Sequence, residues 1–96
     1  MSGVPVQRVD TPHGGEFVFD EGGKRLARMV YKSAGDGKID IVHTEVDASL
    51  KGRGIGRNLL DAAVAWARQT GTKVIATCPY AKSQFEKDAS IRDVLA

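Results

Sequence analysis

The stretch from Thr44 to Arg57, TEVDASLKGRGIGR, decides the fold of this chain. It reads as the end of a β-strand, a tight turn with three alternating glycines, and the first turn of an amphipathic helix. Glycine permits backbone conformations and close approaches that a side chain would block. The helix that follows begins with unpaired N–H groups and the positive end of its dipole. The turn is therefore predicted to bind an anion, above all a phosphate.

Three cations, Lys51, Arg53 and Arg57, surround this turn, so the expected ligand is a pyrophosphate group. Two better-known glycine motifs are excluded by the sequence. The Walker motif requires a glycine followed by Lys-Ser or Lys-Thr, which does not occur here. The dinucleotide motif G-x-G-x-x-G requires a third glycine at the position of Arg57. The remaining alternative is a glycine-rich turn that only begins a helix.

The composition predicts one small globular domain over residues 1–96, with residues 1–5 as a loose end. The chain is 42% hydrophobic and 27% charged, which is ordinary for a globular protein. Its net charge of +2 is too small to predict nucleic-acid binding. No apolar run is long enough to span a membrane, and the N-terminus has no secretory signal. The single cysteine, Cys78, cannot form an internal disulfide, which agrees with a cytoplasmic protein. No His/Cys cluster has metal-binding spacing, so no metal site is expected.

The hydrophobic pattern predicts an antiparallel meander followed by a β-α-β crossover. Alternating and β-branched runs separated by glycine turns predict strands at residues 6–9, 16–20, 24–31 and 38–46. From residue 55 to residue 70 the apolar period becomes that of a helix, and Gly71 is well placed to end it. Residues 72–77 are nearly all apolar, which predicts a strand buried on both faces and paired in parallel.

A second helix is expected to begin at Pro79, a residue that suits the first helical position, with Cys78 as its N-cap. Ser90 is expected to cap a last short turn. The expected fold class is therefore α+β: a mixed, mostly antiparallel sheet of about five strands with a β-α-β crossover and two main helices.

One motif and two short segments resemble the GNAT superfamily of N-acetyltransferases. The pattern [Q/R/K]-x-x-G-x-G from Lys51 to Gly56 is similar to the coenzyme-A-binding motif of that superfamily, which usually has Gln or Arg in place of Lys51. With the segments His43-Thr44-Glu45-Val46 and Cys78-Pro79-Tyr80, it resembles a subgroup of small GNAT-like proteins of about a hundred residues. The resemblance covers about residues 15–90 and implies a minimal GNAT-like fold.

The resemblance implies binding of acetyl-CoA or coenzyme A, and transfer of an acetyl group to an amine on a small molecule or a protein. In that fold two neighbouring parallel strands diverge, and the pantetheine arm of the cofactor lies between them. The cofactor-binding residues that the resemblance implies are Val46, Lys51, Gly52, Arg53, Gly54, Ile55, Gly56 and Arg57.

Four residues are candidates for the chemistry, which needs a base for the amine and an acid for the departing thiolate. Tyr80 is similar in placement to the tyrosine that many GNAT enzymes use as the acid. Cys78 is the alternative, as a nucleophile at a helix N-cap where the dipole favours the thiolate. His43 and Glu45 lie two residues apart and share a strand face, where either is a candidate base. The structural alternatives are a packed core position for Tyr80, Cys78 and His43 and a solvated one for Glu45.

One departure from the superfamily affects the acceptor site. Residues 10–15 stand where full-length GNAT enzymes carry two helices that help to wall that site. The acceptor pocket is therefore expected to be shallow, completed by a partner chain, or absent. Two other functions stay open: a non-catalytic module that binds coenzyme A or acyl-CoA, and a nucleic-acid-binding domain that uses the basic turn but lacks an aromatic platform. We expect a monomer or a weak homodimer.

Overall fold

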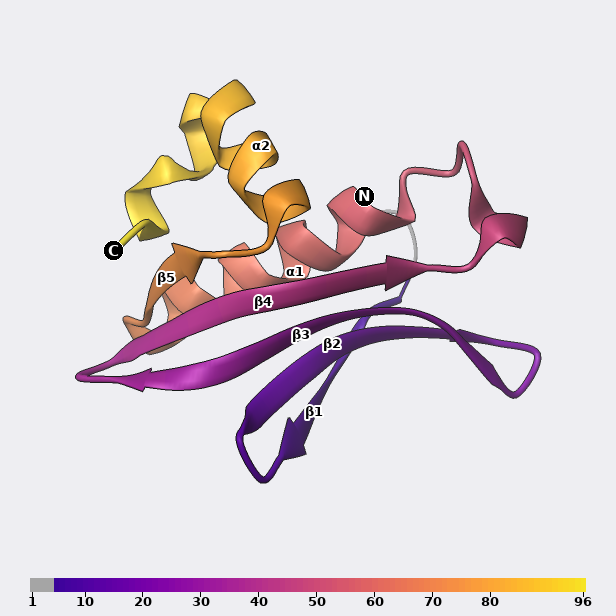
Figure 1. Cartoon of the computed structure of the whole chain (residues 1–96), viewed down its shortest axis with the longest axis horizontal. Coiled ribbons are helices and arrows are strands. Elements are labelled where there is room, and N and C mark those ends of the chain that lie inside the picture. The colour runs from indigo at the N-terminus through magenta and orange to yellow at the C-terminus, as the bar shows by residue number, and fades with distance from the viewer. Residues whose placement is uncertain (1–4) are drawn as a thin grey trace.

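The computed structural model describes residues 5–96 as a five-stranded sheet with its helices on one face (Figure 1). The strands lie in the sheet in chain order: β1 (Gln7–Thr11), β2 (Gly14–Glu21), β3 (Lys24–Gly35), β4 (Lys38–Val46) and β5 (Lys73–Ala76). The helices are α1 (Ile55–Thr70) and α2 (Pro79–Lys87), with 3-10 turns η1 (Ala48–Leu50) and η2 (Ala89–Val94). The first four strands are antiparallel to their neighbours. β4 pairs in parallel with β5, and α1 lies in the connection between them.

The predicted α+β class, meander and crossover are thus confirmed, as are both ends of the first helix. Gly71 ends α1 in the left-handed conformation, and Cys78 is the N-cap of α2, both as expected. The sequence predicts a loose end at residues 1–5, and residues 1–4 of it lie outside the described part of the chain. Within residues 5–96, neither helix is long and apolar enough to cross a membrane.

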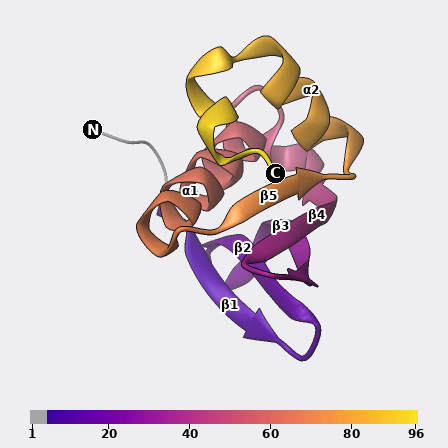
Figure 2. The ribbon, with the colours of Figure 1, turned by 90° about the vertical axis from the view of Figure 1, so that its left-hand side faces the viewer.

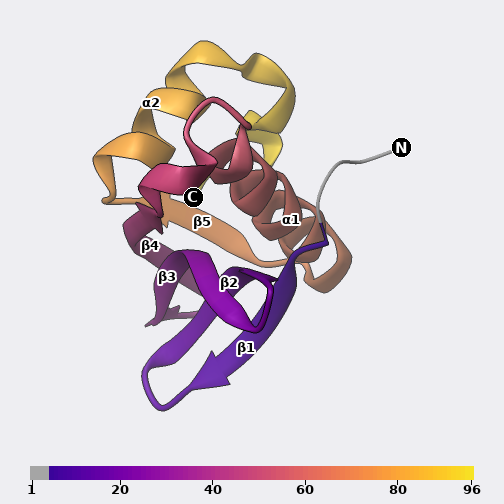
Figure 3. The same cartoon turned by 90° about the vertical axis from the view of Figure 1, so that its right-hand side faces the viewer.

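A single hydrophobic core lies between α1, α2 and the sheet (Figures 2 and 3). The apolar stripe of α1 is buried as its period predicts, through Ile55, Leu59, Leu60, Ala63, Val64 and Ala67. Trp66 is partly buried and packs against this core. The centre of its ring lies 6.0 Å from the ring centre of Phe17 and 5.6 Å from that of Tyr31. Cζ of Arg8 lies 5.1 Å from the centre of the Trp66 ring.

Two predictions about the C-terminal third are wrong. The strand at residues 72–77 was expected to be buried on both faces, but the helices cover only one face of the sheet (Figure 1): Val74 is buried, whereas Ile75, on the other face, is 37% exposed. The meander extends the sheet from β4 in one direction only, so β5 has β4 on one side and a single bridge to Leu95 on the other. The cap of the last turn is Asp88 rather than Ser90, because the Asp88 carboxylate accepts the Ser90 N–H at 2.9 Å.

A β-bulge in β4 determines which of its side chains face the helices. Val30 pairs with His43, but the next residue of β3, Tyr31, pairs with Ile41, so Val42 is an extra residue in β4. After the bulge the alternation is shifted by one residue. Thr44 therefore faces the helices, as Ile41 does, whereas His43 points to the helix-free face of the sheet.

Candidate functional site

The pairing between β4 and β5 stops halfway along β4. The ladder runs from Lys38 with Lys73 to Ile41 with Ala76. It ends where the N–H groups of Thr77 and Cys78 both donate to the Ile41 carbonyl, at 3.1 and 2.8 Å. The chain then turns into α2, while β4 continues toward the glycine turn (Figure 1). Among residues 5–96, no strand pairs with this edge of β4 from residue 42 to residue 46.

The backbone groups on this unpaired edge belong to Thr44 and Val46. The Asp47 N–H donates to the Leu26 carbonyl at 2.7 Å, on the β3 side of β4. Backbone groups of successive strand residues point in alternate directions, so Glu45 also bonds toward β3, and Thr44 and Val46 point the other way. The Val46 side chain lies at the same place and is 39% exposed. This edge can bond an extended ligand as a neighbouring strand would.

Within residues 5–96, the first N–H groups of α1, which follows β4 through the glycine turn, have no hydrogen-bond partner. Its N-cap is Gly54, at φ 70° and ψ 23°, which supplies no side-chain acceptor. The first intrahelical bond is donated by Asn58 to the Gly54 carbonyl at 3.1 Å, so the N–H groups of Ile55, Gly56 and Arg57 precede the helical ladder. A Cβ atom built on Gly52 or Gly54 would meet nothing within 4 Å. The turn is therefore unobstructed at Gly52 and Gly54.

The third glycine of the motif has a different role from the other two. Gly52 and Gly54 have positive φ angles, whereas Gly56 is helical. A Cβ atom on Gly56 would lie 3.2 Å from Cζ and from the hydroxyl oxygen of Tyr80. Gly56 is thus the position at which the Tyr80 ring approaches the first turn of α1. Burial raises the pKa of Tyr80, so its hydroxyl stays protonated at neutral pH.

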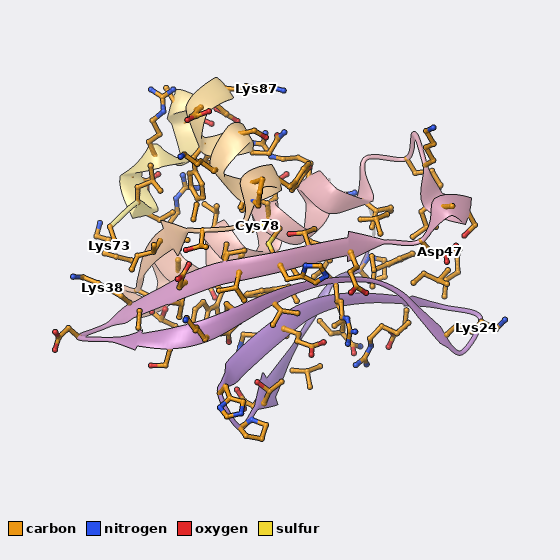
Figure 4. All side chains as sticks on the ribbon, in the orientation of Figure 1. Lys24, Lys38, Asp47, Lys73, Cys78 and Lys87 are labelled. Atoms are coloured by element: carbon orange, nitrogen blue, oxygen red, sulfur yellow. The ribbon has the colours of Figure 1, made fainter. Side chains whose placement is uncertain are left out.

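The four candidate catalytic residues fall into two pairs, one on each side of β4. Cys78 and Tyr80 lie on the helix side, where the Cys78 sulfur is 3.3 Å from the Thr44 hydroxyl. Figure 4 shows Cys78 above the middle of β4 and Asp47 at its end, before the glycine turn. His43 and Glu45 lie on the helix-free face, with Nε2 and Oε2 2.7 Å apart. The hydrogen bond from His43, and then the charge of Arg28, hold the pKa of Glu45 below its usual value.

The three predicted phosphate cations are not equivalent. Lys51 is exposed on the turn, and Arg53 is 45% exposed, with Nη1 and Nη2 each 3.4 Å from a carboxylate oxygen of Glu21. Arg57 instead faces α2. Its guanidinium contacts Asp61 at 2.8 Å, Gln84 at 3.1 Å and the carboxylate of Asp88.

Sequence reasoning missed three residues of this region that matter for its geometry. Thr44 faces Cys78 only because of the bulge, and Asp88 and Gln84 are about thirty residues away from Arg57 in the chain. Asp61 had a local signal, since it follows Arg57 by four residues on a helix.

A surface cavity of about 780 Å³ adjoins the end of β4 and is lined by residues 25–28 and 44–48.

Acid should weaken the fold through Asp88. The Arg57 guanidinium and the bonds from Ser90 lower the pKa of Asp88 from 3.8 to about 2. A carboxylate with a depressed pKa stabilises the fold fully above its unfolded pKa, and this contribution is lost as the pH falls through the folded value. We expect the free energy of unfolding to fall between about pH 4 and pH 2. Urea unfolding at several pH values measures this, and Asp88→Asn should flatten the curve, unlike Glu86→Gln at an exposed carboxylate of the same helix.

The fold and this site define a class of protein. A mixed sheet whose parallel strands diverge beside a glycine turn is the GNAT fold, and the comparisons with solved structures agree. The solution structure of a GCN5-like candidate N-acetyltransferase from Staphylococcus aureus has a TM-score of 0.76 and 34% identity, covering 100% of this chain and 91% of that one. A GNAT family acetyltransferase of Elizabethkingia anophelis, solved with acetyl-CoA bound, has a TM-score of 0.61. It is 17% identical and covers 78% of this chain and 50% of its own, so it shows the fold alone.

The chain belongs to the GCN5-related N-acetyl-transferase family, whose sequence pattern matches residues 16–94. It is also similar to the protein NATD1 of Xenopus tropicalis, with 31% identity over 62 residues. That match covers 65% of this chain and 57% of NATD1, so the chain spans less than two thirds of the length of this relative.

Proposed function

We propose that the protein is an acetyl-CoA-dependent N-acetyltransferase. The observation that carries the proposal is the juxtaposition of free N–H groups at the start of α1 with the unpaired edge of β4. Family membership supports it, as does the neighbour of the same fold that holds acetyl-CoA. The open turn fits the cofactor, because Cβ atoms on Gly52 and Gly54 would stand in free space.

In this proposal the pyrophosphate of the cofactor binds to the N–H groups of Ile55, Gly56 and Arg57. Lys51 and Arg53 add positive charge beside it, and Gly52 and Gly54 allow the close approach. The amides of the pantetheine arm bond to the free backbone groups of Val46 and Thr44, as an added strand would. A thioester held in this way would lie at the open edge of β4, which Cys78 and Tyr80 approach from the helix side.

The bound cofactor supplies an acetyl group activated as a thioester. Tyr80, whose pKa burial raises, donates its proton to the departing sulfur. The acceptor amine approaches from the helix-free face, where His43 or Glu45 takes its proton directly or through water. Cys78 is the second candidate at the sulfur, as a nucleophile that carries the acetyl group in a two-step transfer. Cys78 is only 4% exposed, and its sulfur lies beside Thr44 on β4.

The acceptor side is open. Only residues 12 and 13 join β1 to β2, so the two helices of larger GNAT enzymes are replaced by a turn. The side chains of His43 and Glu45 are 56% and 53% exposed. The acceptor is therefore an amine that meets an open sheet face, on a small molecule or a protein. The same exposure favours the alternative of a non-catalytic module that binds coenzyme A or acyl-CoA.

The test is incubation of the protein with acetyl-CoA and a panel of amines. The proposal predicts stoichiometric binding and release of free thiol that depends on the amine. Binding without thiol release, and without an acetyl adduct on Cys78 by mass spectrometry, would favour the binding module. Failure to bind acetyl-CoA at all would contradict both.

A further inference from the structure

Arg57 lies in the glycine motif but makes its side-chain contacts with α2. Nε donates to Asp61 within α1, and Nη1 and Nη2 donate to Gln84 and Asp88, at the last turn and C-cap of α2. All three nitrogens of the guanidinium therefore have partners, and together they carry its five N–H donors. The side chains of Arg57 and Asp88 are 32% and 30% exposed, less than the 45% of Arg53.

The charge around Arg57 is unfavourable for a phosphate. One guanidinium lies between two carboxylates, Asp61 and Asp88, so the formal charge of the group is one minus two, or −1. Arg53 by comparison has one carboxylate partner at longer distances, and Lys51 is exposed on the turn. The side chain of Arg57 thus differs from those of its two neighbours in the motif.

The residue before Arg57, Gly56, contacts the other end of α2. The Tyr80 ring, in the first turn of α2, lies against the Cα atom of Gly56. Gly56 and Arg57 therefore contact the beginning and the end of α2 from one turn of α1. Because α2 has nine residues and buries only Ala81 and Phe85, these two contacts help to fix its orientation, together with the bonds from Arg92 to the carbonyls of Phe85 and Glu86.

We propose that Gly56 and Arg57 form a clasp that positions α2, and that the Arg57 side chain is a positioning residue and not a phosphate ligand. The clasp is defined by the contacts of Gly56 with Tyr80 and of Arg57 with Gln84 and Asp88. It links the turn whose backbone binds the cofactor to the helix that carries Cys78 and Tyr80. The inference rests on the proposed function, because only then does the position of Tyr80 against the cofactor matter. A displacement of about 1 Å at a reacting group can lower a rate about a hundredfold.

Asp88→Asn distinguishes the two roles of Arg57. If the guanidinium bound phosphate, Asp88→Asn would free the guanidinium and tighten coenzyme A binding. Arg57→Gln would weaken that binding. The clasp predicts instead that both variants lower kcat by a similar factor, about tenfold. Their dissociation constants for coenzyme A, measured by calorimetry, should change less than twofold. The double variant should be no worse than Arg57→Gln alone, because Arg57→Gln already removes the contact with Asp88. Lys51→Gln is the matched control and should weaken binding severalfold.

Gly56→Ala tests the other half of the clasp with the Arg57 contacts in place. It should lower kcat through Tyr80, and should have no further effect when Tyr80 is already Phe. A loss of equal size in the Tyr80→Phe background would contradict the inference. So would Arg57→Gln weakening coenzyme A binding as much as Lys51→Gln does.

A readout without ligand separates this inference from the proposed function. The backbone amide NMR signals of Cys78 and Tyr80 should shift in Arg57→Gln and in Asp88→Asn, and stay in place in Lys51→Gln. If the wild-type protein binds no coenzyme A but these shifts occur, the proposed function fails and the clasp stands. If the signals do not move, the clasp is wrong whatever the protein binds.

Discussion

Alanine in place of Gly54 is expected to weaken acetyl-CoA binding about tenfold or more. Gly54 is the N-cap of α1 at φ 70°, a conformation that L residues avoid, and its Cβ atom would stand in the open space before the helix. The substitution tilts the free N–H groups and fills the place of the anion. Loss of one hydrogen bond to a charged group costs about 1.5–3 kcal/mol, which is about tenfold or more in affinity. Isothermal calorimetry measures the effect.

Gly71 at the other end of the same helix is the matched control. It has φ 70° and ψ 22°, against φ 70° and ψ 23° at Gly54, and its Cβ atom would also meet nothing within 4 Å. Alanine at either position should lower the free energy of unfolding by about 1–2 kcal/mol, because the backbone strain is the same. Only Gly54→Ala should weaken binding. Equal loss of affinity in both variants would mean that general destabilisation is responsible, and that the turn is not the cofactor site.

Phenylalanine in place of Tyr80 is expected to lower kcat about a hundredfold, which is the lower end of the rate enhancement that general acid catalysis usually contributes. The ring would stay against Gly56, so the affinity for acetyl-CoA should hardly change. The hydroxyl, which burial keeps protonated, would be lost. Steady-state thiol release gives kcat, and calorimetry gives the dissociation constant. An unchanged kcat would remove Tyr80 from the chemistry.

Cys78→Ser decides between the two candidates at the sulfur. If Tyr80 is the acid in a direct transfer, this variant should keep most of the activity, since serine is close to cysteine in size and can still bond to Thr44. If Cys78 carries the acetyl group, its replacement should abolish turnover and the adduct seen by mass spectrometry. The two outcomes exclude each other.

Elements specified by neighbouring residues could be predicted from the sequence. Both ends of α1 follow from the change of apolar period at Ile55 and from the glycine at position 71, and the start of α2 follows from Pro79. The exposed face of β5 could not be predicted from its composition. An apolar run indicates burial, but whether a helix covers each face of the strand depends on how the rest of the chain packs.

The candidate site was predicted in part, because its motif is local and its side-chain geometry is not. The turn from Lys51 to Gly56 could be predicted as a candidate anion site from its glycines together with the strand before it, the helix after it and its cations. The bulge at Val42 depends on register with β3, and it places Thr44 rather than His43 on the helix face of the sheet. The partnership of Arg57 with Asp88 depends on the packing of α2, so a cation that the sequence assigns to phosphate is turned toward a helix.

A titration of isotope-labelled protein with acetyl-CoA, followed by the backbone amide signals, tests the central claim most directly. The account predicts the largest shifts at Ile55, Gly56 and Arg57, with further shifts at Thr44, Val46 and residues 77–80, and little change in β1. Signals of residues 55–57 that stay in place at saturating acetyl-CoA would contradict it, because the start of α1 would then not bind the cofactor.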